Sequence, residues 1–263
     1  MKNALTQASA SPARHLLSFT FLIGLITFST GAFAADVRLA VAANFTDTTR
    51  ELITAFAKAT GLEASASFGS TGKLYAQIEN GAPFDVFMAA DSLRPELLES
   101  NGQGVTGSRF TYARGKLVLW SPKSGAFAEA KEWLAQGNFS RLAIANPKTA
   151  PYGLAAKQFL TRAGLWDSLQ SKLVRGDSIS QTFQFAVSGN ADAGFVALSQ
   201  TRVWPREGGT LWPVPQEDYE PINQQAILLT RAQGNDGARR WLEFLRSPQG
   251  RAIIEKYGYG FPD

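Results

Sequence analysis

The stretch Ser67-Phe68-Gly69-Ser70-Thr71-Gly72, followed directly by Lys73-Leu74-Tyr75-Ala76-Gln77-Ile78, decides the fold of this chain. Apolar and polar residues alternate just before it, from Leu62 to Ala66, as they do in a short strand. Leu74 and Ile78 then lie four residues apart, which places them on one face of a helix. The stretch therefore predicts a strand, a tight turn and a helix.

The N-terminus of that helix has the chemistry of an anion site. Its first backbone N–H groups have no partner within the helix, and the helix dipole is positive there. Ser70 and Thr71 add two hydroxyl donors at the same place. An ordinary helix cap is the competing interpretation, because Ser and Thr are good capping residues. For one such turn alone, the cap is favoured.

The same kind of turn occurs four times, which changes that balance. The four turns carry Asn44, Ser70 with Thr71, Tyr152, and the segment 177–180. Strands that alternate with helices predict βαβ units and largely parallel sheets, whose ligands bind beyond the carboxyl ends of the strands. Two turns precede residue 115 and two follow it, so we expect an α/β protein of two lobes with the ligand cleft between them.

The four turns offer neutral donors and few charges. Their hydroxyl, amide and backbone N–H groups suit a small, fully deprotonated oxyanion held by dipoles. The nearest cations are Lys73 and Lys148, and both can point to solvent. Asp177 is an exception, because a carboxylate beside an anion would repel it. We expect Asp177 to cap its own helix with the side chain turned away from the cleft.

Residues 1–34 are interpreted as a secretory signal peptide. Lys2, Arg14 and His15 precede an apolar run from Leu16 to Phe28, and Ala32-Phe33-Ala34 is a small-residue cleavage site. A retained anchor helix is the alternative, but the apolar run is short for a membrane span. Cleavage would leave about 229 residues with 24 basic and 22 acidic side chains. So small an excess does not indicate binding to nucleic acid or membranes.

The absent residue types exclude several classes of function. The chain has no Cys, and its single His is His15 in the leader. Catalysis by Ser-His-Asp or Cys-His and the usual zinc and copper sites are therefore excluded. A secreted hydrolase that uses Asp85 and Asp91 remains an alternative, but they flank an apolar strand and would not converge on one substrate. A transcriptional effector domain would need an attached helix-turn-helix. Binding without a cofactor or catalysis is the favoured function.

Short motifs along the whole mature chain resemble those of the periplasmic molybdate-binding proteins of bacterial ABC importers. They are Ala42-Ala43-Asn44-Phe45, Gly69-Ser70-Thr71-Gly72, Tyr75-Ala76-Gln77-Ile78, Asn80-Gly81-Ala82-Pro83, Ala90-Asp91, Gly115-Lys116-Leu117-Val118-Leu119-Trp120, Asn146-Pro147, Ala150-Pro151-Tyr152-Gly153 and Tyr257-Gly258-Tyr259. The resemblance implies a type II periplasmic binding protein. Its first lobe would comprise residues 35–114 and 224–263, and its second lobe residues 115–223.

The resemblance also implies a ligand set. Asn44, Thr71, Tyr152 and the backbone N–H of Ile179 would hold the oxyanion, with Ala43 and Ser70 beside them. Many members of the family have Ser where this chain has Thr71, so the hydroxyl is kept. Some members use a Tyr from the strand that reads Gly194-Phe195-Val196-Ala197 here. That Tyr is missing, so the donor role is assigned to Tyr152; the alternative for Tyr152 is a packed aromatic residue under the rim of the cleft.

The expected function follows from this resemblance. The chain would be a monomeric periplasmic receptor that captures molybdate, and also tungstate, and delivers it to the membrane permease and ATPase of an ABC importer. No cofactor, catalytic residue or nucleic acid is expected. A receptor for another tetrahedral oxyanion, such as sulfate or phosphate, is the alternative that stays open.

Overall fold

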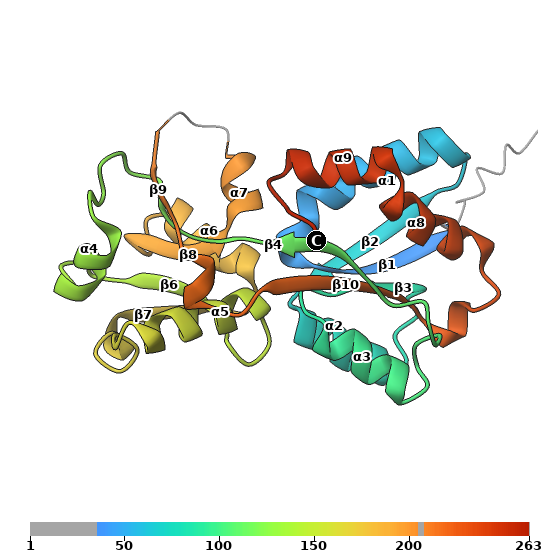
Figure 1. Ribbon diagram of the computed structural model, residues 1–263, viewed down its shortest axis with the longest axis horizontal. Helices are drawn as coiled ribbons and strands as arrows, with labels where there is room; N and C mark the ends of the chain where they lie inside the picture. The colour runs from blue at the N-terminus through green and yellow to red at the C-terminus, as the bar shows by residue number, and fades with distance from the viewer. Residues whose placement is uncertain (1–35, 205–207, 263) are drawn as a thin grey trace, which may run out of the picture. The chain divides into compact units, whose positions relative to one another are not determined.

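The computed structural model describes residues 36–204 and 208–262 of the chain (Figure 1). The predicted signal peptide at residues 1–34 lies outside the described residues. Within the described part of the chain, no helix is both long and apolar enough to span a membrane.

In the described part of the chain, ten strands form two five-stranded sheets, in the orders β2-β1-β3-β10-β4 and β7-β6-β8-β5-β9. The strands of the first sheet are β1 (Val37–Ala42), β2 (Ala64–Gly69), β3 (Val86–Met88), β4 (Phe110–Gly115) and β10 (Ile222–Leu228). Those of the second sheet are β5 (Leu117–Ser121), β6 (Leu142–Ala145), β7 (Leu173–Gly176), β8 (Ala193–Ala197) and β9 (Thr210–Pro213).

Both sheets are mixed, so the expectation of largely parallel sheets was only partly correct. β1 pairs in parallel with β2 and β3, and β6 pairs in parallel with β7 and β8. β10 is antiparallel to β3 and β4, and β5 is antiparallel to β8 and β9. The antiparallel pairings involve β5 and β10, which lie next to the two places where the chain crosses from one sheet to the other. β4 leads directly into β5, and β9 leads through a short segment back to β10.

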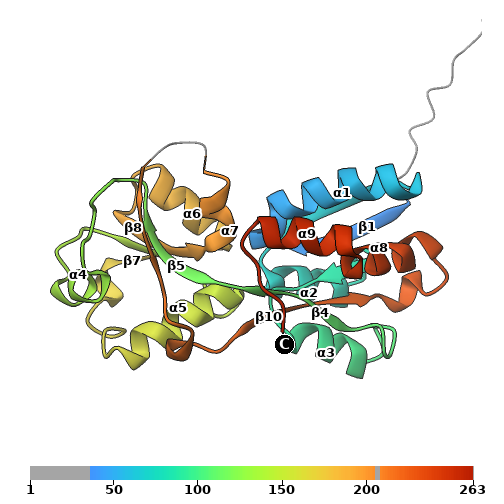
Figure 2. The same ribbon diagram turned by 45° about the horizontal axis from the view of Figure 1, so that its top comes forward.

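Helices cover both faces of each sheet. Those that follow strands of the first sheet are η1 (Ala43–Phe45), α1 (Thr46–Thr60), α2 (Thr71–Glu79), α3 (Leu93–Ser100), η4 (Thr230–Ala232), α8 (Asp236–Arg246) and α9 (Pro248–Lys256). Those of the second are α4 (Ala130–Gln136), α5 (Pro151–Arg162), η2 (Gln170–Lys172), α6 (Ile179–Val187), α7 (Leu198–Arg202) and η3 (Gln216–Asp218). In Figures 1 and 2, α1, α8 and α9 cover one face of the first sheet, and α2 and α3 cover the other.

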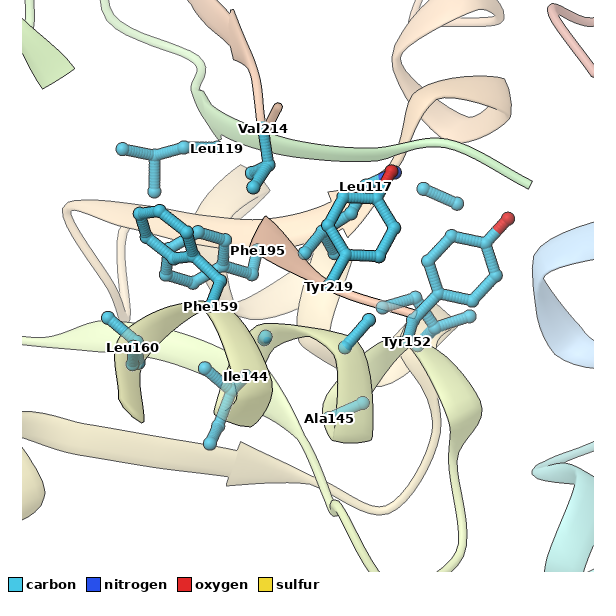
Figure 3. Packing of buried hydrophobic residues seen from close by; sticks show 14 of the residues in the cluster. Leu117, Leu119, Ile144, Ala145, Tyr152, Phe159, Leu160, Phe195, Val214 and Tyr219 are labelled. Atoms are coloured by element: carbon cyan, nitrogen blue, oxygen red, sulfur yellow. The ribbon is translucent and has the colours of Figure 1, made fainter. Parts of the chain in front are cut away.

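Alternation along the strands explains this layering. In β5, Leu117 and Leu119 pack with the residues of α5, whereas Val118 and Trp120 pack with Phe183 of α6. Successive side chains of a strand point to opposite faces of the sheet, so α5 and α6 must lie on opposite faces. Figure 3 shows the α5 side of this packing. The first sheet is built in the same way, with separate clusters under α1 and under α2.

The sheets are the cores of the two predicted lobes. The first sheet is built from segments at both ends of the described chain, and the second from the segment between them. Lobe boundaries after residues 114 and 223 stay a prediction.

Candidate functional site

Four chain turns leave the two sheets at the carboxyl ends of neighbouring parallel strands. In the first sheet, Ala42 at the end of β1 pairs with Gly69 at the end of β2. In the second sheet, Ala145 at the end of β6 pairs with Gly176 at the end of β7. Each pair of turns is therefore held side by side, and the helices η1, α2, α5 and α6 follow them with their N-termini at the same edge.

The turns of both sheets line one small cavity of about 10 Å³. Its lining residues are Ala42, Ala43, Asn44, Gly69, Ser70, Thr71, Ala90, Ala150, Pro151, Tyr152 and Ile179. All six residues predicted to hold the ligand are among them, and no lining residue carries a charge. The other five are small or apolar, so their types gave no signal in the sequence. Drug-sized ligands occupy roughly 300–1,000 Å³, so this cavity suits a far smaller species.

Two buried hydroxyl groups of residues that line the cavity make no hydrogen bond of normal geometry within the protein. They belong to Ser70, which is 4% exposed, and to Tyr152, which is 1% exposed. Figure 3 shows Tyr152 at the edge of its apolar cluster, with the hydroxyl pointing away from the labelled aliphatic side chains. Burial raises the pKa of Tyr152 well above its usual value, and the Gln224 side chain opposes this shift only in part, so the hydroxyl keeps its proton at neutral pH. Buried polar groups are normally paired, so these two hydroxyls are available as donors to a ligand.

The hydroxyl of Thr71 is also able to donate into the cavity. Its Oγ1 accepts a hydrogen bond from the backbone N–H of Ala90 at 3.1 Å, which leaves its own hydrogen free. Ser70 stands at the N-cap of α2, but its side chain makes no capping hydrogen bond. The capping alternative for this turn is therefore wrong for Ser70. Thr71 instead joins α2 to the segment that follows β3.

Asn44 is held by a buried network rather than left free. Its Nδ2 donates to Gln224 Oε1 at 2.8 Å and to Tyr259 Oη at 3.0 Å. The Asn44 carbonyl accepts from Tyr259 Oη at 2.8 Å and from Ser199 Oγ at 3.1 Å. Both side-chain N–H groups are thus used within the protein. Because Asn44 lies in the short helix η1, its backbone N–H is the donor that remains for the cavity.

Gln224 ties this network to a strand that joins the sheets. It lies on β10 and is fully buried, and its Oε1 also accepts from Tyr112 Oη on β4 at 3.3 Å. A register shift occurs at Gln224 in the pairing of β10 with β4. The sequence did not single out Gln224, because a Gln in an apolar strand has no motif of its own. The structure identifies it, together with Tyr259, as a residue that positions Asn44.

Ile179 presents the first backbone N–H of α6, which has no acceptor within its helix. Ser178 caps α6 by accepting from Gln181 N at 3.2 Å, so the expectation that Asp177 caps this helix was wrong. The Asp177 carboxylate instead pairs with Lys73 Nζ at 2.8 Å on the exposed surface. Asp177 does not line the cavity, as expected.

The two carboxylates of the hydrolase alternative have separate structural partners. Asp85 pairs with Arg38 at 3.4 Å and with Arg231 at 3.0 Å. Asp91 pairs with Arg94 one turn along the chain, and burial raises its pKa. Neither lines the cavity. Among the described residues, no group of three or more acidic, His or Cys side chains could hold a metal ion.

A two-lobed α/β fold with a small, uncharged, donor-lined cavity at the strand ends defines the class of the periplasmic binding proteins. Comparison with known proteins agrees: the profile of the family described as bacterial extracellular solute-binding protein matches residues 37–260. The chain belongs to this family. The family is one of binding proteins and not of enzymes, as predicted.

Similarity to individual proteins is more specific. The chain is 49% identical to the molybdate-binding protein ModA of Azotobacter vinelandii over 239 residues, which cover 90% of this chain and 95% of that protein. It is 46% identical to ModA of Rhodobacter capsulatus, over 87% of this chain and 89% of that protein. The solved structure of the Azotobacter vinelandii periplasmic molybdate-binding protein matches with a TM-score of 0.83 at 42% identity, covering 86% of this chain and all of that one. The resemblance seen in the motifs is confirmed.

Proposed function

We propose that the chain is a periplasmic receptor for molybdate and that it binds tungstate as well, through neutral donors. The observation that carries this proposal is the pair of buried hydroxyls, on Ser70 and Tyr152, that make no hydrogen bond of normal geometry in the protein and belong to residues lining an uncharged cavity. The Thr71 hydroxyl and the backbone N–H groups of Asn44 and Ile179 complete the donor set. Similarity to molybdate-binding proteins that cover almost the whole chain supports the choice of ligand.

The donor set favours an anion without a proton. The eleven lining residues include no Asp or Glu, so the cavity has no carboxylate that could accept a proton from the ligand. Phosphate carries a proton near neutral pH, and that proton would be buried without a strong acceptor. Molybdate, tungstate and sulfate are fully deprotonated there. Sulfate is therefore the closest competitor. It is smaller than molybdate and tungstate, so the cavity would have to distinguish these anions by size.

The partners follow from the same function. A receptor of this kind delivers its ligand to the permease and ATPase of an ABC importer in the membrane. Residues 1–34 would direct the chain to the periplasm, where it acts as a monomer. The protein needs no cofactor, because capture of an oxyanion by fixed dipoles involves no chemistry on the ligand.

A competition titration tests the proposal. The purified mature chain is titrated calorimetrically with molybdate, tungstate, sulfate and phosphate at one ionic strength. We expect molybdate and tungstate to bind with similar affinity, and sulfate and phosphate to bind at least about a hundredfold more weakly, which corresponds to a free-energy difference of about 2.7 kcal/mol. Sulfate binding as tight as molybdate binding would move the function to the alternative ligand. No binding of any of the four would refute an oxyanion receptor.

A further inference from the structure

Gly72 occupies a position where a glycine is locally unfavourable. It is the second residue of α2, and its φ angle lies outside the left-handed region that favours glycine. Within a helix, alanine is favoured over glycine because glycine loses more backbone freedom on folding. The conformation of the backbone therefore does not explain the residue.

The surroundings of Gly72 do explain it. A Cβ atom at this position would lie 3.1 Å from Thr149 Cα, 3.2 Å from the Thr149 carbonyl oxygen and 3.2 Å from Arg94 Nη2. These distances are shorter than ordinary van der Waals contacts, and two of the three atoms belong to backbone that cannot rotate away. The Gly72 N–H donates to the Thr149 carbonyl at 2.9 Å. Thr149 lies in the turn after β6 of the second sheet, whereas α2 follows β2 of the first sheet.

A second hydrogen bond joins the turn after β6 to the first-sheet side. Arg94 of α3 donates through Nη2 to the Lys148 carbonyl at 3.0 Å, and the Asp91 carboxylate holds the same guanidinium through Nη1. Two successive carbonyls, of Lys148 and Thr149, are thus held by donors from the first-sheet side. The turn that they hold continues into Ala150 and Tyr152, which line the cavity.

The cavity itself requires these turns to separate. Asn44, Ser70, Thr71 and Tyr152 are each no more than 4% exposed, so an anion cannot reach their donors while the turns are in contact. Hinged opening and closing is the common way in which two-lobed proteins admit a buried ligand. A Cβ at position 72 would meet Thr149 only when the turns are together and would meet nothing from the second sheet when they are apart.

We propose that Gly72 is a positioning residue for the ligand: the absence of its side chain lets the two turns close until donors from both sheets reach one anion. This inference rests on the proposed function. Gly72 acts without touching the ligand. Compared with alanine, it makes α2 less stable in the open protein, but it allows the two turns to approach each other closely in the closed protein.

The substitution Gly72→Ala separates these two effects, because they have opposite signs. In the ligand-free protein, alanine strengthens α2, so the melting temperature is expected to equal or exceed that of the parent. In the ligand-bound protein, alanine crowds Thr149, and overpacking of this kind is expected to weaken molybdate binding roughly ten- to a hundredfold. The loss should appear mainly in a faster dissociation rate, since the closed state is the one destabilised. Gln77→Ala, on the exposed face of the same helix, is the control and should leave affinity unchanged.

Calorimetry and stopped-flow dissociation with molybdate, together with thermal melts without it, decide the matter. Equal affinity of the Gly72→Ala protein and the parent overturns the inference while leaving the proposed function intact. Weaker binding accompanied by a lower melting temperature of the free variant also overturns it, because the substitution would then destabilise the whole protein and not only its closed state. If the parent itself binds no molybdate, the proposed function fails first and the inference fails with it.

Discussion

The substitution Tyr152→Phe tests the site most directly, because it removes one oxygen atom and nothing else. The Tyr152 ring is 1% exposed and packs in the second-sheet core, so phenylalanine fills the same space. The hydroxyl makes no hydrogen bond of normal geometry in the protein, although Gln224 lies close enough to affect its pKa, so its removal breaks no well-formed internal hydrogen bond. The free protein should therefore melt at the same temperature or higher, since a buried unpaired polar group is destabilising by roughly 1–3 kcal/mol.

The bound protein should respond in the opposite direction. A hydrogen bond to a charged group contributes roughly 1.5–3 kcal/mol, so its loss should weaken molybdate binding about ten- to a hundredfold. Isothermal titration calorimetry measures the affinity, and thermal melts with and without molybdate measure the two stabilities. Molybdate should then raise the melting temperature of the variant less than that of the parent.

Tyr219→Phe is a matched control from the same core. Tyr219 is 3% exposed, but its hydroxyl accepts a hydrogen bond from Leu117 N at 3.2 Å. Its loss leaves the buried N–H of Leu117 without this acceptor, so it should lower stability by roughly 1–3 kcal/mol and leave affinity unchanged. If Tyr152→Phe binds molybdate as tightly as the parent, Tyr152 is a packed aromatic residue and not a ligand donor. If both variants lose stability and keep affinity, the reasoning from unpaired hydroxyls is refuted.

Three further outcomes are expected. Thr71→Val should lower stability by roughly 1–3 kcal/mol, because the buried N–H of Ala90 loses its acceptor, and should weaken binding about ten- to a hundredfold. Thr71→Ser keeps the hydroxyl and should keep both stability and affinity. A serine variant that binds as weakly as the valine variant would contradict this prediction. Lys73→Ala should change affinity less than about fivefold at any salt concentration, since the ion pair of Lys73 with Asp177 is exposed. A steep dependence of molybdate affinity on salt, measured by calorimetry, would instead indicate that Lys73 binds the ligand. Binding should be flat from pH 6 to 8, since no described residue is a His, whereas stability should fall as pH rises above about 10. Burial raises the pKa of Tyr152, so the folded protein holds this proton more tightly than the unfolded chain; a pH titration of the melting temperature tests the sign.

The sequence by itself determined the local elements and the chemistry of the turns. The alternation before Ser67 and the helical spacing of Leu74 and Ile78 depend only on neighbours in the chain, and the structure has β2 and α2 where they were predicted. The absence of Cys, and of His outside the leader, is likewise a property of composition. Because parallel strands end at one edge of a sheet, the four turns could be expected to meet before any contact was known.

Local errors arose where a tertiary contact outweighed a local preference. Asp177 is a good capping residue, but Ser178 caps α6 and the carboxylate of Asp177 reaches Lys73 across 104 positions of sequence. The sheets are mixed because β5 and β10 enter them from the crossings, and no strand pattern encodes the direction of a partner strand.

Only the tertiary structure decided which donors are free. Asn44 looked like a side-chain ligand, but Gln224 and Tyr259, 180 and 215 residues away, take both of its side-chain N–H groups. Ser70 and Tyr152 were predicted at the ligand, with a helix cap and a packed ring as the alternatives, and neither hydroxyl makes a hydrogen bond of normal geometry within the protein. A hydrogen bond depends on distances of a few tenths of an ångström between segments far apart in the chain. Residue type determines which hydrogen bonds a group can donate, and the fold determines which of these donors remain free for a ligand.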